Sequence, residues 1–208
     1  HEEGSIHIHD LDFLTLTLTC CQIDLEKLFK GGFHTGHGSI REPKTIQTYA
    51  ALTAIAIQSN QNDQHGGQSV PNFDYYLSDG VRKSYIKRFR ENLAKVLKIN
   101  GINADAKEIL NQIKEQHNVA PKYLNNEINP YLKEYLTKLN LANIDNLITF
   151  ITNEASSEVE NDTYQAMESL IHNLNTMHSR AGAQVPFSSI NYGTDTSNEG
   201  RLVVRKML

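Results

Sequence analysis

Two adjacent cysteines, Cys20 and Cys21, stand at the end of a stretch that alternates apolar and polar residues. A thiol held in a fixed place can transfer a proton, an electron or a hydrogen atom. Cysteine is also a small residue that proteins often bury without using its chemistry. Residue parity groups Cys20 with the leucines of this stretch and Cys21 with its threonines, but a β-bulge would exchange the two faces. The pattern alone therefore does not choose between the two thiols.

A pair of histidines, His7 and His9, lies on one face of the same alternating stretch. Two imidazoles at this spacing can bind a divalent metal, with Asp10 or Asp12 completing the ligand set. The same side chains could instead be hydrogen-bonded polar groups at the end of a strand. One alternative function is therefore a metal-dependent hydrolase that uses His7 and His9 as ligands.

Two segments could bind phosphate groups. Gly66 and Gly67 could bring backbone amides against a phosphate, although their spacing fits neither a P-loop nor a dinucleotide fingerprint, and an ordinary flexible loop has the same composition. The segment 81–98 carries a basic face, which could hold phosphate or could simply be solvated.

The strands and loops that must position these residues follow from the spacing of apolar residues. Period-two alternation over residues 5–23 predicts a strand, interrupted by a turn at 10–12. Residues 183–192 read as a second strand, with a turn at 193–196. Glycine and amide content predicts loops at 33–39 and 60–79.

Helices are expected between these strands. A short helical turn should cover Leu25 to Phe29, and the longer predicted helices run from about Pro43 to Ser59, about Ser78 to Lys98, and roughly 155–179. Residues 100–153 suggest short helices broken near Pro121 and Pro130. Strands and helices in one chain favour an α/β fold, with helices outside a sheet or barrel.

Composition excludes several classes of protein. The 208 residues suit one large domain or two small ones, and 39% hydrophobic with 21% charged residues argues against a disordered chain. A net charge of −4 does not suit a dedicated nucleic-acid-binding protein. No apolar run approaches the roughly 20 residues of a membrane helix. Adjacent cysteines form no disulfide framework, which favours the cytoplasm. The first residue is not Met and the last segment is unfinished, so we expect a piece of a longer protein.

Several segments together resemble the anaerobic (class III) ribonucleoside-triphosphate reductases, a family of glycyl radical enzymes. They are His7–Asp12, Thr19–Leu25, Gly31–Phe33, Glu42–Lys44, His65–Asp74 and Pro186–Thr194. The segments occur in the order of the family and at about its spacing. They cover roughly residues 4–90 and 160–208, whereas 100–153 matches only weakly. No single segment is specific, but the combination is.

This resemblance implies an α/β fold that forms the first part of a ten-stranded α/β barrel, with a largely helical middle section. Residues 1–208 would be the N-terminal part of the catalytic barrel domain. Within it, 1–79 would carry active-site and effector-loop motifs, 80–180 would be mainly helical, and 181–208 would hold a strand and the start of the next helix. The regulatory ATP cone, the radical cysteine loop and the glycyl radical region would lie outside this chain, and the isolated piece should be inactive.

The resemblance also implies a reaction, the anaerobic reduction of ribonucleoside triphosphates to deoxyribonucleoside triphosphates for DNA synthesis. A radical S-adenosylmethionine activase generates the glycyl radical, which oxidises a cysteine that then removes the 3′ hydrogen of the ribose. Formate supplies the electrons in many members. Zinc occupies a C-terminal site outside this chain, and no metal is expected within it. The implied partners are the substrate, dNTP or ATP effectors, a second copy in a homodimer and the activase, with no membrane and no direct nucleic-acid contact.

Individual residues take their expected roles from the same resemblance. Cys20 would protonate the departing 2′ hydroxyl, because an ordinary thiol, with a pKa of about 8.5, stays protonated at neutral pH. Lys44 and Lys87 would bind the effector, and the adjacent Arg41 stands where some members carry an acidic residue. The expected substrate-binding residues are His7, His9, His65, Gly66, Gly67, Gln68, Ser69, Ser188 and Ser189. The remaining alternative, a non-catalytic helical interaction module, would not need Cys20 at a strand end.

Overall fold

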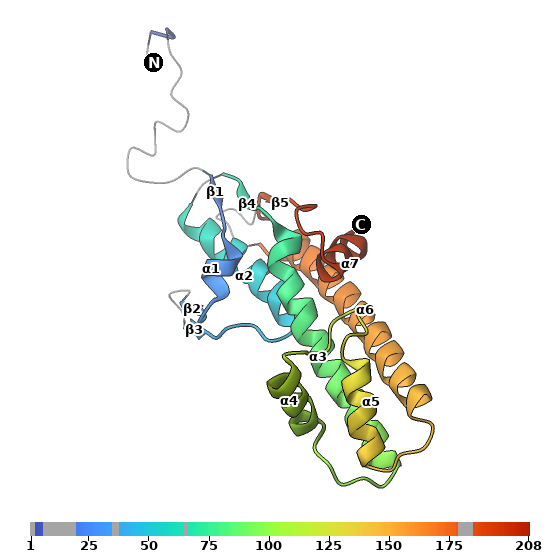
Figure 1. Ribbon diagram of the computed structural model, residues 1–208. Coiled ribbons are helices and arrows are strands. Elements are labelled where there is room, and N and C mark those ends of the chain that lie inside the picture. Colours follow the sequence, from blue (N-terminus) through green and yellow to red (C-terminus); the bar gives the residue numbers. More distant parts are fainter. Residues whose placement is uncertain (1–2, 6–19, 35–37, 65, 179–184) are drawn as a thin grey trace.

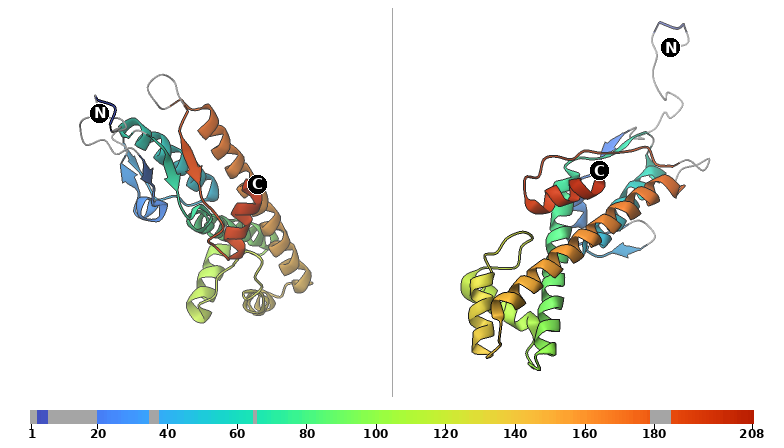
Figure 2. Two further views of the ribbon diagram at one scale, coloured as in Figure 1. Left: turned by 90° about the horizontal axis from the view of Figure 1, so that it is seen from above. Right: turned by 90° about the vertical axis from the view of Figure 1, so that its right-hand side faces the viewer.

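Long helices run through most of the molecule in the computed structural model (Figure 1), which describes residues 3–5, 20–34, 38–64, 66–178 and 185–208. α6 (Ile144–Thr176) packs along α3 (Phe73–Ile99), and the right-hand view of Figure 2 shows the two helices crossing. α2 (Ile46–Asp63) packs against both. Every fourth residue of α3 from Val81 to Leu93 is buried, in agreement with the helix predicted from about Ser78 to Lys98.

Shorter helices complete the two ends of this framework. α4 (Ala106–His117) and α5 (Asn129–Lys138) lie at the end away from the sheet, where α4 contacts α3 and α5 contacts α6 (Figure 1). α7 (Asn198–Met207) packs on α3 and α6 nearer the sheet. No described helix is both long enough and apolar enough to cross a membrane.

A small parallel sheet lies at the other end. Its strands are β1 (Cys21–Gln22), β4 (Gln68–Val70) and β5 (Ser188–Ile190), in the order β1-β4-β5. α1 (Leu25–Phe29) follows β1, and β2 (Phe33–His34) pairs with β3 (Ser39–Ile40) in a separate antiparallel ladder. The described residues therefore form a mixed α/β structure that is mostly helical.

Several predicted boundaries were wrong. The segment 60–79 is not a loop, because it contains the end of α2, the strand β4 and the first turns of α3. The segment 33–39 holds β2 and the first residue of β3. α2 begins after Thr45, whose side chain forms a reciprocal cap with Thr48, rather than at Pro43.

Other helix predictions were partly or fully confirmed. α1 covers the predicted Leu25–Phe29. α6 begins at Ile144, before the predicted start near 155. Pro130 lies in the first turn of α5, where its missing N–H is tolerated, and α4 ends before Pro121. The strand predicted at 183–192 is β5, which is shorter, and the strand predicted at 5–23 lies largely outside the described residues.

Gly80 allows α3 to approach α2 closely. A Cβ at this position would lie 2.9 Å from two ring carbons of Tyr49 and 3.2 Å from the Cα of Ile46. Tyr49 cannot easily give way, because its hydroxyl is bonded to Asp79 on α3. We expect Gly80→Ala to lower the free energy of unfolding by about 1–2 kcal/mol, since overpacking outweighs the better helix propensity of alanine.

Urea unfolding of the purified chain measures this effect. Gly67→Ala is the matched control, because its added methyl group would meet no atom within 4 Å. Equal loss of stability in the two variants would contradict the close approach of α2 and α3.

Candidate active site

The parallel sheet presents two different faces. Strand register places Cys21, Gln68 and Ser188 in one row, and Gln22, Ser69 and Ser189 in the next. Successive side chains of a strand point to opposite faces, so the two rows face opposite ways. The first row faces the helices, because Gln68 is fully buried and contacts Asn60 of α2. We call the other side, which carries Gln22, Ser69 and Ser189, the open face.

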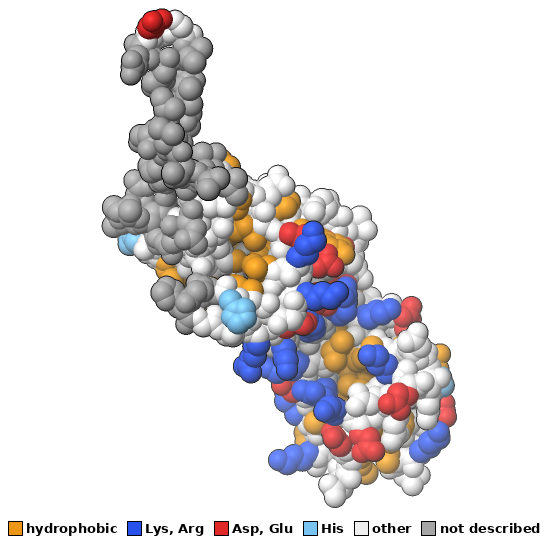
Figure 3. All heavy atoms as spheres, turned by 90° about the vertical axis from the view of Figure 1, so that its left-hand side faces the viewer, with side chains coloured by type: hydrophobic (Ala, Val, Ile, Leu, Met, Phe, Trp, Pro, Cys, Tyr) orange, Lys and Arg blue, Asp and Glu red, His pale blue; other side chains and the backbone are white. Residues whose placement is uncertain are grey.

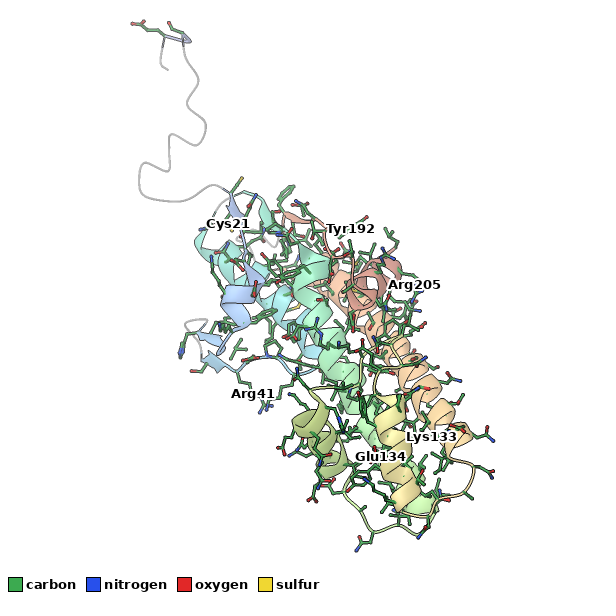
Figure 4. The ribbon with its side chains drawn as sticks, in the orientation of Figure 1. Cys21, Arg41, Lys133, Glu134, Tyr192 and Arg205 are labelled. Carbon is green, nitrogen blue, oxygen red and sulfur yellow. The ribbon has the colours of Figure 1, made fainter. Side chains whose placement is uncertain are left out.

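The two cysteines lie on different sides of this sheet. Cys21 is half-buried, and its thiol contacts Gln68 and Asn60 on the helix side. Burial raises the pKa of Cys21, and the hydrogen bond from Asn60 only partly offsets this. Cys20 is exposed and directly precedes β1, so strand alternation directs it to the open face. Figure 4 shows the position of Cys21 at the start of β1.

The serines expected to bind substrate lie in β4 and β5, and the glycines directly precede β4, the strand that pairs with β1. Ser69 and Ser189 are neighbours on the open face. Ser188 is exposed on the edge strand β5, in the same row as Gln68. Gly66 and Gly67 directly precede β4, and Gly66 has a φ of 88°, which favours glycine.

Other expected residues lie apart from this group. The side chain of Gln68 faces the helices rather than the open face. His7, His9 and His65 lie outside the described residues. The open face therefore brings together a thiol and hydroxyl groups, which can exchange protons and hydrogen bonds with a ligand rich in hydroxyl groups.

Asp74 supports the open face from the first turn of α3 and was not singled out by the sequence. Its fully buried carboxylate accepts hydrogen bonds from the backbone N–H groups of Gly193 (2.9 Å) and Asp195 (3.0 Å), and from the hydroxyl of Thr194 (3.2 Å). These bonds fix the turn that follows β5. Acidic residues are favoured in the first turn of a helix, so the sequence did contain a signal that could have identified Asp74.

A charged cluster, which the sequence also did not indicate, joins α3 to the segment before α2. Lys83 Nζ lies 2.8 Å from Asp79 Oδ2 and 3.0 Å from Glu42 Oε1, and it donates to the Tyr49 hydroxyl at 2.9 Å. Tyr49 in turn donates to Asp79 at 2.5 Å. Burial and the bond to Asp79 raise the pKa of Tyr49 to about 12. A cavity of about 330 Å³ adjoins the cluster.

The cluster should contribute stability that is lost in acid. Burial alone would raise the pKa of Asp79, but hydrogen bonds from Lys83 and Tyr49 outweigh it and lower the pKa below its ordinary value of 3.8. A carboxylate with a lowered folded pKa stabilises the protein above its unfolded pKa, and this contribution disappears as pH falls through the folded value. As pH falls below about 5, we expect the free energy of unfolding to decrease less in Asp79→Asn than in the unchanged chain.

Urea unfolding at a series of pH values tests this dependence. Asp145→Asn is the control, because Asp145 pairs with Lys133 on the surface, where such pairs contribute little. An acid limb in Asp79→Asn as steep as that of the unchanged chain would contradict the role of the cluster.

Lys44 lies two residues before α2, and this helix contacts α3, which carries Lys87. The Ile46 N–H at the start of α2 donates to Ser84 Oγ at 2.8 Å, one turn before Lys87 on α3. Lys44 and Lys87 are both exposed, as is Arg41, which Figure 4 shows at the surface. Figure 3 shows Lys and Arg side chains gathered along the middle of one side of the molecule. This region offers positive charge for an anionic ligand.

The metal-site hypothesis receives no support from the part of the chain that the structure describes. No group of three or more His, Cys, Asp or Glu residues there could hold a metal ion. His7 and His9, on which that hypothesis rests, lie outside the described residues.

Comparisons with known proteins agree on one family. The family of anaerobic ribonucleoside-triphosphate reductases matches residues 1–208. Proteins with this name from Enterobacteria phage T4, Salmonella typhimurium and Escherichia coli are 26%, 28% and 27% identical to the chain over 210 residues. The alignments cover 100% of the chain, but 26% of the phage protein and 22% of each bacterial protein. The chain therefore spans about a quarter of the length of these relatives.

Proposed function

Because the chain belongs to the anaerobic ribonucleoside-triphosphate reductase family, we propose that it forms one wall of an active site that reduces ribonucleoside triphosphates to deoxyribonucleoside triphosphates for DNA synthesis. One observation carries this proposal. Cys21 turns toward the helices, where its thiol contacts Asn60, so strand alternation directs the exposed Cys20 to the face that carries Ser69 and Ser189. In this arrangement Cys20 is the thiol that can meet a substrate.

In the whole protein, the parallel sheet becomes part of a ten-stranded barrel. The proposal is supported by the helices that pack on one side of the sheet and by the solvent-exposed Gln22 and Ser189 on the other. Parallel sheets are usually covered on both faces. Closing the barrel places the helices outside and turns the open face toward the interior, where the nucleotide binds.

Cys20 acts as a general acid in this reaction. In the family, a radical S-adenosylmethionine activase generates a radical on a glycine outside this chain. This radical oxidises a cysteine, also outside this chain, which then removes the 3′ hydrogen of the ribose. Cys20 then donates its S–H proton to the 2′ hydroxyl as the C2′–O bond breaks, so that water leaves and a thiolate remains. Formate supplies the two electrons of the reduction. The zinc site of the family lies in another part of the whole protein.

The remaining residues position the substrate. The hydroxyl groups of Ser69 and Ser189 hydrogen-bond to the nucleotide on the open face, and Ser188 contacts it from the edge strand. Gly66 and Gly67 allow the backbone before β4 to approach its phosphates. His7, His9 and His65 complete the pocket. Gln68, which is buried, supports the sheet instead of contacting the nucleotide through its side chain.

An anaerobic assay of the full-length protein tests this function. With activase, S-adenosylmethionine, formate and a ribonucleoside triphosphate, we expect deoxyribonucleoside triphosphate to accumulate. Metal-dependent hydrolysis of the nucleotide without any reduction would favour the hydrolase hypothesis and contradict the proposal.

A second nucleotide binds as an effector beside α2 and α3, in a homodimer of the whole protein. Lys44 and Lys87 contact its phosphates, and Arg41 adds positive charge nearby. Lys87 is available for this role, because its one ion-pair distance among the described residues, to Glu91 on the same helix, is 3.9 Å. A charge at that distance on the surface holds a lysine only weakly.

Removal of the Lys87 charge should weaken effector binding. We expect Lys87→Ala in the full-length dimer to reduce dNTP affinity by about 1.5–3 kcal/mol, the range of charge-assisted contacts. The variant should also blunt the effector-dependent choice of substrate while basal reduction continues.

Isothermal titration calorimetry with a dNTP measures the affinity. Lys133→Ala, an exposed lysine on α5 at the far end of the molecule (Figure 4), is the control and should bind normally. Unchanged affinity in Lys87→Ala would refute the effector site.

A further inference from the structure

Among the residues that the structure describes, β1 is attached to the sheet by a small number of contacts. Its described part contains two residues and lies at one edge of the three strands described. The Cys21 N–H donates to the carbonyl oxygen of Gly67, directly before β4, at 3.1 Å, and the Ile23 N–H donates to that of Ser69 in β4 at 2.8 Å. Short edge elements with few bonds open easily. Side-chain contacts therefore matter for holding the residues at this strand end in place.

The Cys21 thiol supplies such a contact. It donates to Gln68 Oε1 at 2.9 Å and accepts from Asn60 Nδ2 at 2.8 Å. Gln68 is fully buried in the central strand β4, and Asn60 lies in the last turn of α2, where it also donates to Gln64 at 3.2 Å. One sulfur atom thus connects β1 to both its neighbouring strand and the helix behind the sheet.

We propose that Cys21 is a positioning residue, whose hydrogen bonds to Asn60 and Gln68 hold β1 so that Cys20 projects from the open face toward the substrate. This inference rests on the function proposed above, in which Cys20 is the proton donor. Neighbouring residues of a strand point to opposite faces, so fixing the side chain of Cys21 on the helix side fixes the direction of Cys20.

The contact requires a group that both donates and accepts. Burial raises the pKa of Cys21, which keeps its S–H available to Gln68 at neutral pH. A serine hydroxyl can also donate and accept, whereas an alanine side chain can do neither. Cys21→Ser and Cys21→Ala therefore separate the hydrogen bonds from the mere presence of a small side chain.

The test uses steady-state kinetics of the full-length enzyme. We expect Cys21→Ala to lower kcat at least tenfold while KM changes less than twofold, because a small displacement of a reacting group has a large effect on rate. Cys21→Ser should retain kcat within threefold of the unchanged enzyme. Ile23→Val is the control for general loosening of this segment and should keep normal kcat.

A second readout does not depend on turnover. The rate at which iodoacetamide alkylates Cys20, followed by mass spectrometry of its peptide, should change at least threefold in Cys21→Ala and less than twofold in Cys21→Ser. If Cys21→Ala does not fold, Asn60→Ala, which removes the donor on α2, should show the same changes in kcat and alkylation.

Two results would overturn the inference. One is normal kcat and normal Cys20 alkylation in Cys21→Ala, or in Asn60→Ala where the former does not fold. The other is a Cys21→Ser enzyme as impaired as Cys21→Ala. Failure of the proposed function has a different signature, since an unchanged enzyme without reductase activity, or an active Cys20→Ala enzyme, would show it. The alkylation experiment would still report on the role of Cys21.

Discussion

Cys20→Ala in the full-length protein is expected to lower the reduction of ribonucleoside triphosphates at least a hundredfold, because general acid catalysis typically contributes a factor of 10²–10⁴. Alanine has no proton to give, so hydroxide would have to leave the 2′ carbon without help. The glycyl radical should still form, because Cys20 acts after it. Anaerobic assays of dNTP formation, with electron paramagnetic resonance of the radical, measure both quantities.

A matched variant separates this role from the general need for a thiol in the segment. Cys21→Ser changes the neighbouring residue, which faces the helices, and should remain within threefold of normal activity. Sustained dNTP production by Cys20→Ala would show that Cys20 is not the proton donor, and the open face would then offer no described thiol for the reaction.

Asp74→Ala should have the largest effect on stability. The substitution leaves the N–H groups of Gly193 and Asp195 and the hydroxyl of Thr194 without their shared acceptor. Gly193 and Thr194 are exposed and Asp195 is half-buried, so water can replace part of what these donors lose. Because hydrogen bonds to a charged group contribute about 1.5–3 kcal/mol, we expect the free energy of unfolding to fall by about 2–3 kcal/mol. The turn after β5 would loosen, and Ser189 on the open face would lose its support.

Urea unfolding of the purified chain measures this change. Asp74→Asn keeps one acceptor oxygen and should lose less, and Asp145→Ala, an exposed aspartate of α6, should lose under about 1 kcal/mol. If Asp74→Ala also lowered the free energy of unfolding by less than about 1 kcal/mol, the turn would not depend on the carboxylate.

Local signals explain which helices the sequence predicted well. The four-residue spacing from Val81 to Leu93 marks the buried face of α3, and Leu25 to Phe29 forms the predicted helical turn. The true start of α3 was missed because Asn72 adopts a left-handed conformation with a φ of 53° and no side-chain cap. Without a capping signal, residues 73–77 were assigned to the polar loop that precedes them.

The sheet could not be predicted from local pattern. Gln68 and Ser69 are polar residues of a three-residue strand, and their partners lie far away in the sequence, at Cys21 and Ser188. Parity left the two cysteines undecided. Only the register with β4 and the contact with Asn60 show which thiol faces the helices.

The charged cluster at Lys83 also could not be predicted from local pattern. Its partners Glu42 and Tyr49 lie at least 34 residues away in the chain, so no spacing rule for a single helix could find them. The resemblance to a family directed attention to Lys44, two residues after Glu42, and to Lys87, four residues after Lys83, but it gave no reason to examine Lys83 itself.

The most direct test of the central claim is a structure of the full-length protein with a bound ribonucleoside triphosphate. We predict that the ribose lies against the open face beside Ser69 and Ser189, with the Cys20 sulfur within about 4 Å of the 2′ oxygen, close enough to transfer a proton. A nucleotide bound away from this face, or a Cys20 thiol covered by another segment of the protein, would contradict the account.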